Sequence, residues 1–146
     1  MELNQDFREF FEFLNKNEVR YLIVGGFAVA FHGHPRYTKD IDIWIDATPN
    51  NAVRLIQSLR DFGFASIGLL VEDFLAPGYT IQLGVVPNRI DLLTSARGLD
   101  FESCFASRVE AVVGGVTVHV IDLDHLKQNK RAAGWSQDLA DLEHLE

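Results

Sequence analysis

Two aspartates separated by one residue, Asp40 and Asp42, have the clearest potential for chemistry in this chain. They lie in the segment TKDIDIWID, where an isoleucine stands at every second position, so the pattern predicts a strand over Lys39–Asp46. Because side chains alternate across a strand, both carboxylates share one face, with Cα atoms about 6.5 Å apart. Carboxylate oxygens are hard ligands, so the pair indicates a site for a divalent cation.

A third carboxylate, Asp91, stands in the apolar segment NRIDLLT, which predicts a second strand over Arg89–Leu93. The alternative interpretation is that Asp40, Asp42 and Asp46 mark only the solvated face of an edge strand. If Asp91 joins the pair, any two of the three carboxylates that are about 5 Å apart repel each other by about 3 kcal/mol at an effective dielectric constant of about 20. Such a cluster persists when cations occupy it or when one member is protonated. The sequence therefore favours a metal site.

A glycine pair, Gly25-Gly26, follows the apolar strand Tyr21–Val24 and opens a short helix predicted over Gly26–His32. Backbone N–H groups at such a turn can approach phosphate oxygens, because no Cβ stands in the way. The alternative is a tight strand-to-helix turn without a ligand. Together with the carboxylates, this turn predicts a site for a nucleoside triphosphate bound with Mg²⁺.

Length and composition set the frame for these residues. The 146 residues with 47% hydrophobic side chains predict a single domain over 1–146, and no apolar run approaches the length of a membrane span. A single cysteine, Cys104, and an acidic N-terminus without a signal-peptide pattern predict a cytoplasmic protein. The net charge of −8 argues against broad DNA binding.

The elements that position the site alternate between helix and strand early in the chain, which predicts an α/β (α+β) domain with a small mixed sheet. Gly114-Gly115 predicts a hairpin turn, and two short helices are expected within about 123–145. Helices are predicted over 4–16, 51–62, 100–107, 124–133 and 137–145, and further strands near Val71–Leu75, over Tyr79–Val85 and on either side of the glycine turn at 111–113 and 116–121.

These motifs resemble a known family. Gly25-Gly26, thirteen residues, and Asp40-Ile41-Asp42-Ile43 resemble the signature of the DNA polymerase β-like nucleotidyltransferase superfamily. The similarity is greatest to its minimal bacterial and archaeal members, some of which work in toxin–antitoxin pairs. It extends over about residues 19–145, because the segment around Asp91 resembles the strand with the third carboxylate and 129–141 resembles the helical tail of one uncharacterised branch.

The resemblance implies a small twisted sheet backed by helices and a nucleotidyl transfer reaction. Asp40 and Asp42 would hold two Mg²⁺ ions, with Mn²⁺ as an alternative, and Asp91 would complete the site that activates an incoming hydroxyl. The hydroxyl would attack the α-phosphorus of an NTP, and pyrophosphate would leave. The acceptor could be a protein side chain, a tRNA 3′ end or a small molecule, and a cognate toxin or acceptor protein is the implied partner.

Basic residues complete the predicted nucleotide site beside Gly25 and Gly26. Arg36 and Lys39 can neutralise triphosphate charge, and Lys130 matches a lysine of the related branch that reaches the nucleotide. The alternative is that these are solvated charges, with Lys130 favoured by the C-terminus of its helix. Relatives usually have Arg-Pro where this chain has Trp135 and Ser136, which removes one expected phosphate contact.

Two other functions use the same residues. A catalytically weak nucleotidyltransferase fold could act as a binding module, such as an antitoxin-like or regulatory partner. A metal-dependent phosphohydrolase would share the carboxylates but use water as the nucleophile. A zinc site formed by His32 and His34 is not expected, because no cysteine or further histidine accompanies them at a suitable spacing.

Overall fold

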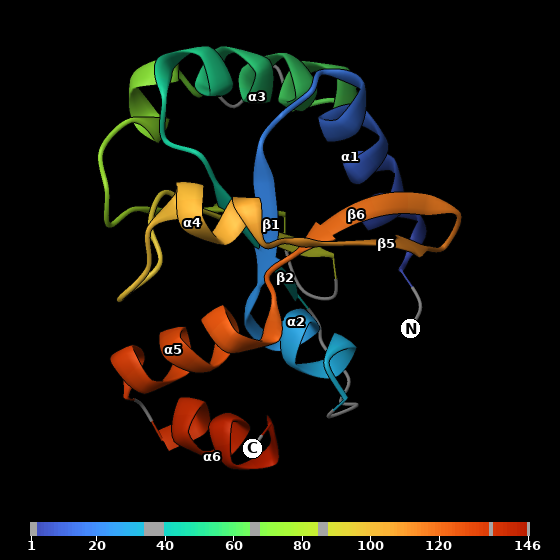
Figure 1. The fold of residues 1–146 in the computed structure, drawn as a ribbon. Coiled ribbons are helices and arrows are strands. Elements are labelled where there is room, and N and C mark those ends of the chain that lie inside the picture. The colour runs from blue at the N-terminus through green and yellow to red at the C-terminus, as the bar shows by residue number, and fades with distance from the viewer. Residues whose placement is uncertain (1–2, 34–39, 65–67, 85–87, 135, 146) are drawn as a thin grey trace.

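A six-stranded mixed sheet forms the centre of the fold. The structure is a computed structural model that describes residues 3–33, 40–64, 68–84, 88–134 and 136–145. The strand order is β3-β4-β2-β1-β6-β5, with parallel pairing for β2–β4 and β1–β6 and antiparallel pairing elsewhere. In Figure 1, α1 and α3 lie above the strands and α2, α5 and α6 lie below them. The predicted α/β class is confirmed.

The strands are β1 (Tyr21–Val24), β2 (Asp40–Ile45), β3 (Thr80–Leu83), β4 (Arg89–Leu93), β5 (Val109–Val113) and β6 (Val116–Val120). The helices are α1 (Gln5–Lys16), α2 (Gly25–Phe31), α3 (Pro49–Phe62), α4 (Phe101–Ala106), α5 (Leu123–Ala133) and α6 (Ser136–Leu145). None of the helices in the described part of the chain is both long and apolar enough to cross a membrane.

Strand β2 lies inside the sheet, between β4 and β1, so the edge-strand interpretation of its aspartates is wrong. Ile41, Ile43 and Ile45 are buried on one face, as the alternation predicts. Trp44, on the other face, is also buried, and its ring makes an edge-to-face contact with Phe101 at 5.1 Å. The strand is therefore anchored on both faces, which fixes the direction of its carboxylates.

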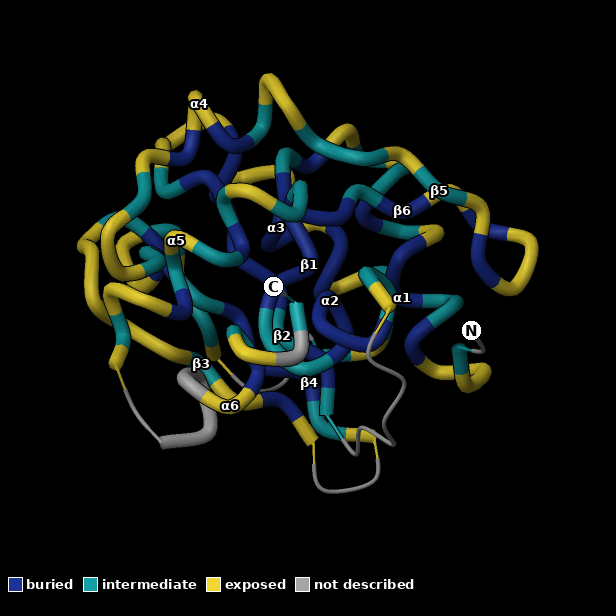
Figure 2. Tube along the Cα trace, turned by 60° about the horizontal axis from the view of Figure 1, so that its bottom comes forward, coloured by how far each residue is buried: buried dark blue, intermediate teal, exposed yellow. Residues whose placement is uncertain are grey.

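Helix α1 supplies much of the core above the sheet. Asn4 caps it by accepting a hydrogen bond from the backbone N–H of Phe7 at 2.8 Å. The buried side chains of α1 recur at helical spacing and include Phe10, Phe11 and Leu14. All four residues of β1 are buried as well, and Figure 2 shows the buried backbone gathered along the central strands.

The C-terminal part of the fold, from β5 to α6, agrees with the hairpin and the two helices predicted from the sequence. Gly114 and Gly115 both have positive φ angles, +60° and +81°, and join β5 to β6 in the predicted hairpin. Asp122 caps α5, and Gly134 ends it in the left-handed region at φ +67°. Helices α5 and α6 then pack side by side (Figure 1).

The strand predicted near Val71–Leu75 is wrong. Residues Val71–Phe74 form a short 3₁₀ helix, η2. The Asp73 carboxylate accepts a hydrogen bond from the backbone N–H of Leu70 at 2.8 Å, which closes a local turn. Phe74 is the buried residue of this short helix and packs into the core, while Glu72 and Asp73 are exposed.

Candidate active site

Three carboxylates converge where β2 and β4 run side by side. In this parallel pair, Asp42 lies opposite Asp91, and Asp40 lies opposite Arg89. One carboxylate oxygen each from Asp40, Asp42 and Asp91 lies within 4.8 Å of the others. Asp91 is 5% exposed, whereas Asp40 and Asp42 are half-buried. The predicted third carboxylate therefore does join the pair.

Arg89 is a member of this cluster that the sequence analysis missed. Its Nη2 donates to Asp40 Oδ2 at 2.6 Å and to Asp91 Oδ2 at 3.1 Å, and its Nε lies 3.1 Å from Asp91 Oδ1. The charge of Asp91 and the hydrogen bond to Asp40 raise the pKa of Arg89. Its position two residues before Asp91 was the available signal, because that spacing places both side chains on one strand face.

Asp42 is the carboxyl group that this environment perturbs most. Burial, followed by the neighbouring charges of Asp40 and Asp91, raises its pKa from 3.8 to about 7. The charge of Lys130 acts in the opposite direction. An excess of negative charge at a half-buried point is what a bound cation would relieve.

We expect this carboxyl group to make the metal-free protein less stable as the pH rises. The folded chain binds a proton at Asp42 up to about pH 7, whereas an unfolded chain releases it near pH 3.8. The stabilisation is therefore fully present below the unfolded pKa and is lost as the pH rises through 7, at up to about 1.4 kcal/mol per pH unit. Urea denaturation with EDTA across this range measures it. The Asp42→Asn variant lacks the group and should lose this part of the slope; equal slopes in both proteins would contradict the expectation.

Gly25 brings the glycine turn into contact with the carboxylates. Val24, the last residue of β1, pairs with Asp42, so Gly25 begins α2 directly beside that carboxyl group. Its φ is +65°, and a Cβ added there would overlap Asp42 Oδ2 and lie 2.9 Å from Asp42 Cγ. Gly25 and Gly26 are partly exposed, and no side chain caps the start of α2. Glycine is thus required by both the backbone angle and the neighbour.

The donor set fits a divalent cation of the Mg²⁺ type. All three groups are carboxylates, which are the hard oxygen ligands that Mg²⁺ and Mn²⁺ take in proteins. Asp91 Oδ1 is buried and accepts no hydrogen bond from the described residues, although it lies beside Arg89 Nε. That oxygen therefore has lone pairs that a cation can use.

Lys130 reaches the site from α5 and is held by α6. Its Nζ lies 3.2 Å from Asp141 Oδ2, and the two side chains are only 8% and 1% exposed. Asp141 was part of the tail motif, but its pairing with Lys130 could not be read from the sequence, since it depends on how α6 folds back on α5. The pair holds a buried positive charge close enough to influence Asp42.

Breaking this pair should destabilise the protein strongly. The Asp141→Asn variant keeps the side-chain shape but leaves the Lys130 ammonium without its buried carboxylate, which we expect to cost about 3 kcal/mol of unfolding free energy. Urea denaturation is the measurement, with Glu143→Gln on the exposed side of α6 as the matched control. Similar denaturation midpoints for the two variants would show that the Lys130–Asp141 pair contributes little.

The remaining predicted residues divide into two groups. Arg36 and Lys39, like His34 and Trp135, lie outside the described residues. Among the others, His32 ends α2 with its Nε2 at 2.7 Å from the backbone oxygen of Ile121, and the fully buried Cys104 has a pKa raised by burial to about 11. Neither faces the carboxylates as a ligand in the cluster.

Asp46, the last carboxylate of the segment, has a structural role. Its Oδ2 lies 3.1 Å from Arg20 Nη1, and its backbone oxygen accepts a hydrogen bond from Asn51 at 2.9 Å. Asp46 is 7% exposed and does not belong to the cluster of three. It therefore anchors the start of β1 to the end of β2.

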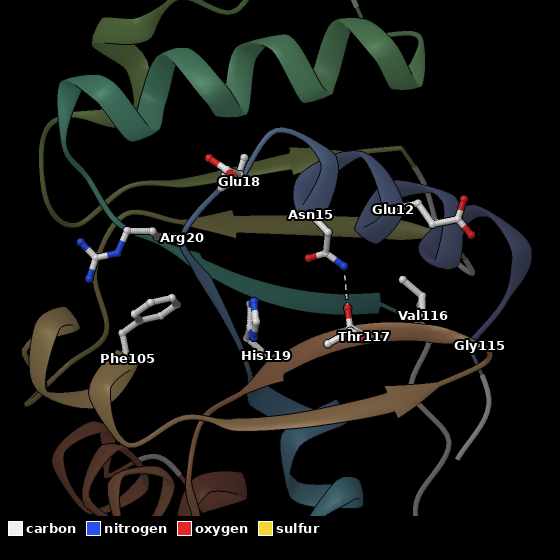
Figure 3. Close-up of a pocket in the computed structure, with 10 residues that line it drawn as sticks. Glu12, Asn15, Glu18, Arg20, Phe105, Gly115, Val116, Thr117 and His119 are labelled. Atoms are coloured by element: carbon white, nitrogen blue, oxygen red, sulfur yellow. Dashed lines mark hydrogen bonds between the residues drawn. The ribbon is translucent and has the colours of Figure 1, made fainter.

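A separate pocket of about 620 Å³ lies at the start of β1, the end away from the carboxylate cluster, between α1, α4 and β6 (Figure 3). Its lining includes Glu12, Arg20, Phe105 and His119, and Asn15 Nδ2 donates to the backbone oxygen of Thr117 across it at 2.6 Å. None of the three clustered aspartates lines this pocket. The chemistry predicted from the sequence therefore belongs to the carboxylate cluster.

Solved structures with the same fold are known. A protein from Thermotoga maritima, provisionally named a nucleotidyltransferase, superposes with a TM-score of 0.65 at 16% identity, covering 94% of this chain and 88% of its own. An antigenic nucleotidyltransferase-like protein from Paracoccidioides brasiliensis superposes with a TM-score of 0.54 at 19% identity, covering 99% and 78%. No family model and no curated protein matches the sequence. The chain has the fold of these nucleotidyltransferase-like proteins.

Proposed function

We propose that this protein is a Mg²⁺-dependent nucleotidyltransferase that moves an NMP from an NTP to a hydroxyl acceptor. The observation that carries the proposal is the convergence of Asp40, Asp42 and Asp91 within 4.8 Å, beside the turn at Gly25. The fold shared with nucleotidyltransferase-like proteins supports it. The same cluster would serve Mn²⁺ in place of Mg²⁺.

Each group of the cluster has a role in this proposal. Asp40 and Asp42 would hold two Mg²⁺ ions, and Asp91 would complete the ion site on the acceptor side. Bound ions of this kind supply positive charge to the attacking and leaving oxygens. Because Asp42 stands on a strand anchored on both faces, the carboxylates keep their positions during the reaction. The protein therefore contributes mainly orientation and charge.

The glycine turn would hold the phosphates on the side of Asp42 that faces away from Asp91. The partly exposed backbone N–H groups of Gly25 and Gly26 can donate to phosphate oxygens without obstruction by a side chain. Lys130 brings a positive charge to the same region, and Arg36 and Lys39 would add to it. The acceptor oxygen would bond to the α-phosphorus and lose its proton, while the bond to the leaving pyrophosphate breaks.

The acceptor is a protein side chain, a tRNA end or a small molecule, and a toxin–antitoxin pair is one setting in which a protein acceptor would occur. The cytoplasmic location expected from the single cysteine remains a prediction.

Transfer of label from α-³²P-labelled NTPs tests the proposal. The purified protein is incubated with Mg²⁺ and each NTP, alone, with total tRNA and with a bacterial protein extract. We expect an acid-stable label on one macromolecule, release of pyrophosphate, and no label with Asp40→Ala or Asp91→Ala. Release of inorganic phosphate without labelling would favour a phosphohydrolase instead.

One observation favours the alternative of a catalytically weak binding module. Arg89 already compensates the charges of Asp40 and Asp91 without a metal ion. A module of this kind would bind a partner protein equally well with and without Asp40 and Asp91, and would transfer no label in the same assay.

A further inference from the structure

Arg89 binds carboxylate oxygens of two of the three candidate metal ligands, Asp40 and Asp91. Its Nη2 bridges Asp40 Oδ2 and Asp91 Oδ2, and its Nε faces Asp91 Oδ1. The contact on Asp91 therefore involves both oxygens of that carboxylate. On the sheet, Arg89 and Asp91 stand two residues apart on one face of β4, opposite Asp40 and Asp42 on β2. The guanidinium is therefore held in the cluster by contacts to two of its carboxylates.

We propose that Arg89 is the resident counter-ion of this site and makes it select a cation that arrives with a triphosphate over the free cation. The inference rests on the proposed function, because it concerns the same three carboxylates. It adds a selection step: the guanidinium must leave Asp40 and Asp91 before a divalent ion can use all of their oxygens.

The reason is the fixed charge of arginine. A guanidinium remains protonated at every physiological pH, so it cannot yield its place by losing a proton. A free divalent cation that enters the cluster must compete with it for the oxygens and then stands close to a like charge. A cation bound to a triphosphate brings phosphate oxygens with it, and these bind a displaced guanidinium in the same forked manner as a carboxylate.

The side chain has room for this exchange. It is 31% exposed, so its long aliphatic stem can carry the guanidinium out of the cluster toward solvent. The Asp91 side chain, by contrast, is only 8% exposed, and its residue is paired within the sheet on β4. Arg89 therefore moves while the carboxylates stay, and binding of metal and nucleotide becomes mutually reinforcing.

Mn²⁺ titration followed by electron paramagnetic resonance tests this inference without an activity assay. We expect the Arg89→Gln variant to bind free Mn²⁺ about tenfold more tightly than the wild type, because the competing charge is gone. With a non-hydrolysable NTP present, the wild type should gain affinity for Mn²⁺ by a factor about tenfold larger than the variant gains. Equal or weaker binding of free Mn²⁺ by folded Arg89→Gln overturns the proposal.

Further variants make the result unambiguous. Arg54→Gln, at an exposed position of α3, a helix that carries none of the clustered aspartates, removes the same charge and should bind Mn²⁺ as the wild type does. If Arg89→Gln does not fold, Arg89→Lys is the test, because an ammonium group cannot span both carboxylates. We expect Arg89→Lys to bind free Mn²⁺ about threefold more tightly than the wild type. Unchanged or weaker binding of free Mn²⁺ overturns the proposal. If Asp42→Asn binds Mn²⁺ as well as the wild type does, the proposed function itself fails. If Asp42→Asn loses Mn²⁺ binding but the Arg89 variants bind free Mn²⁺ no more tightly than the wild type, the proposed function stands and only the role given to Arg89 is wrong.

Discussion

The Asp42→Asn variant should lose nucleotidyl transfer by about a thousandfold or more while keeping its fold. Asparagine has the same shape but offers a neutral oxygen at the centre of the cluster, where Asp42 lies between Asp91 and the turn at Gly25. Removal of a single preorganised hydrogen-bond donor from an active site typically costs about 10²–10³ in rate, and we expect a larger loss here because Asp42 is proposed to serve both ions. Release of pyrophosphate from NTP, with the acceptor that becomes labelled, is the measurement.

The fold of this variant should be at least as stable as the wild type above pH 7 in the absence of metal. The reason is that the asparagine side chain has no charge to bury, whereas the pKa of Asp42, raised to about 7, reports a cost of ionisation in the folded chain. Asp124→Asn, an exposed change of the same chemical kind in the first turn of α5, is the control. Activity within tenfold of wild type in Asp42→Asn would remove this carboxylate from the proposed mechanism.

The Gly25→Ala variant should be nearly as damaging, for a steric reason. The added methyl group overlaps Asp42 Oδ2, and because β2 pairs on both sides, the Asp42 backbone stays in place and its carboxylate must rotate away. The φ of +65° adds about 1 kcal/mol of backbone strain for a residue with a Cβ. We expect binding of Mn²⁺ together with a non-hydrolysable NTP to weaken about a hundredfold, and the unfolding free energy to fall by about 2–3 kcal/mol.

Gly68→Ala separates the two causes. Gly68 has a similar φ of +75°, but a Cβ there meets no atom of the described residues within 4 Å. This control should show the backbone strain alone, with a loss of about 1 kcal/mol and unchanged Mn²⁺ binding. If Gly25→Ala lost no more stability than Gly68→Ala and bound the metal–nucleotide complex normally, the close packing of the turn against Asp42 would have no functional meaning.

The sequence predicted those features that depend on local spacing. The alternation around Asp40 and Asp42 placed both carboxylates on one strand face, and the glycine pairs at 25–26 and 114–115 marked the two turns correctly. The structure adds caps of the same local kind, because Asn4 and Asp122 each accept a hydrogen bond from a backbone N–H in the first turn of α1 and α5. In each case the signal lies within a few residues of the element that it forms.

Features that depend on distant contacts could not be predicted in the same way. The parallel pairing of β2 with β4 places Arg89 opposite Asp40, but the residues near each of them do not predict this strand register. The pairing of Lys130 with Asp141 requires α6 to fold back on α5. The strand predicted near Val71–Leu75 is wrong because the Asp73 carboxylate bonds to the backbone N–H of Leu70 and closes a local turn there.

A crystal structure of the protein with Mn²⁺ and a non-hydrolysable NTP measures the site most directly, since Mn²⁺ is located by its anomalous scattering. We predict Mn²⁺ bound by oxygens of Asp40, Asp42 and Asp91, with the triphosphate against the N–H groups of Gly25 and Gly26 and the Arg89 guanidinium withdrawn from Asp40. Nucleotide bound away from β2 and β4, with no Mn²⁺ at the three aspartates, would contradict the assignment of this cluster as a nucleotidyltransferase site.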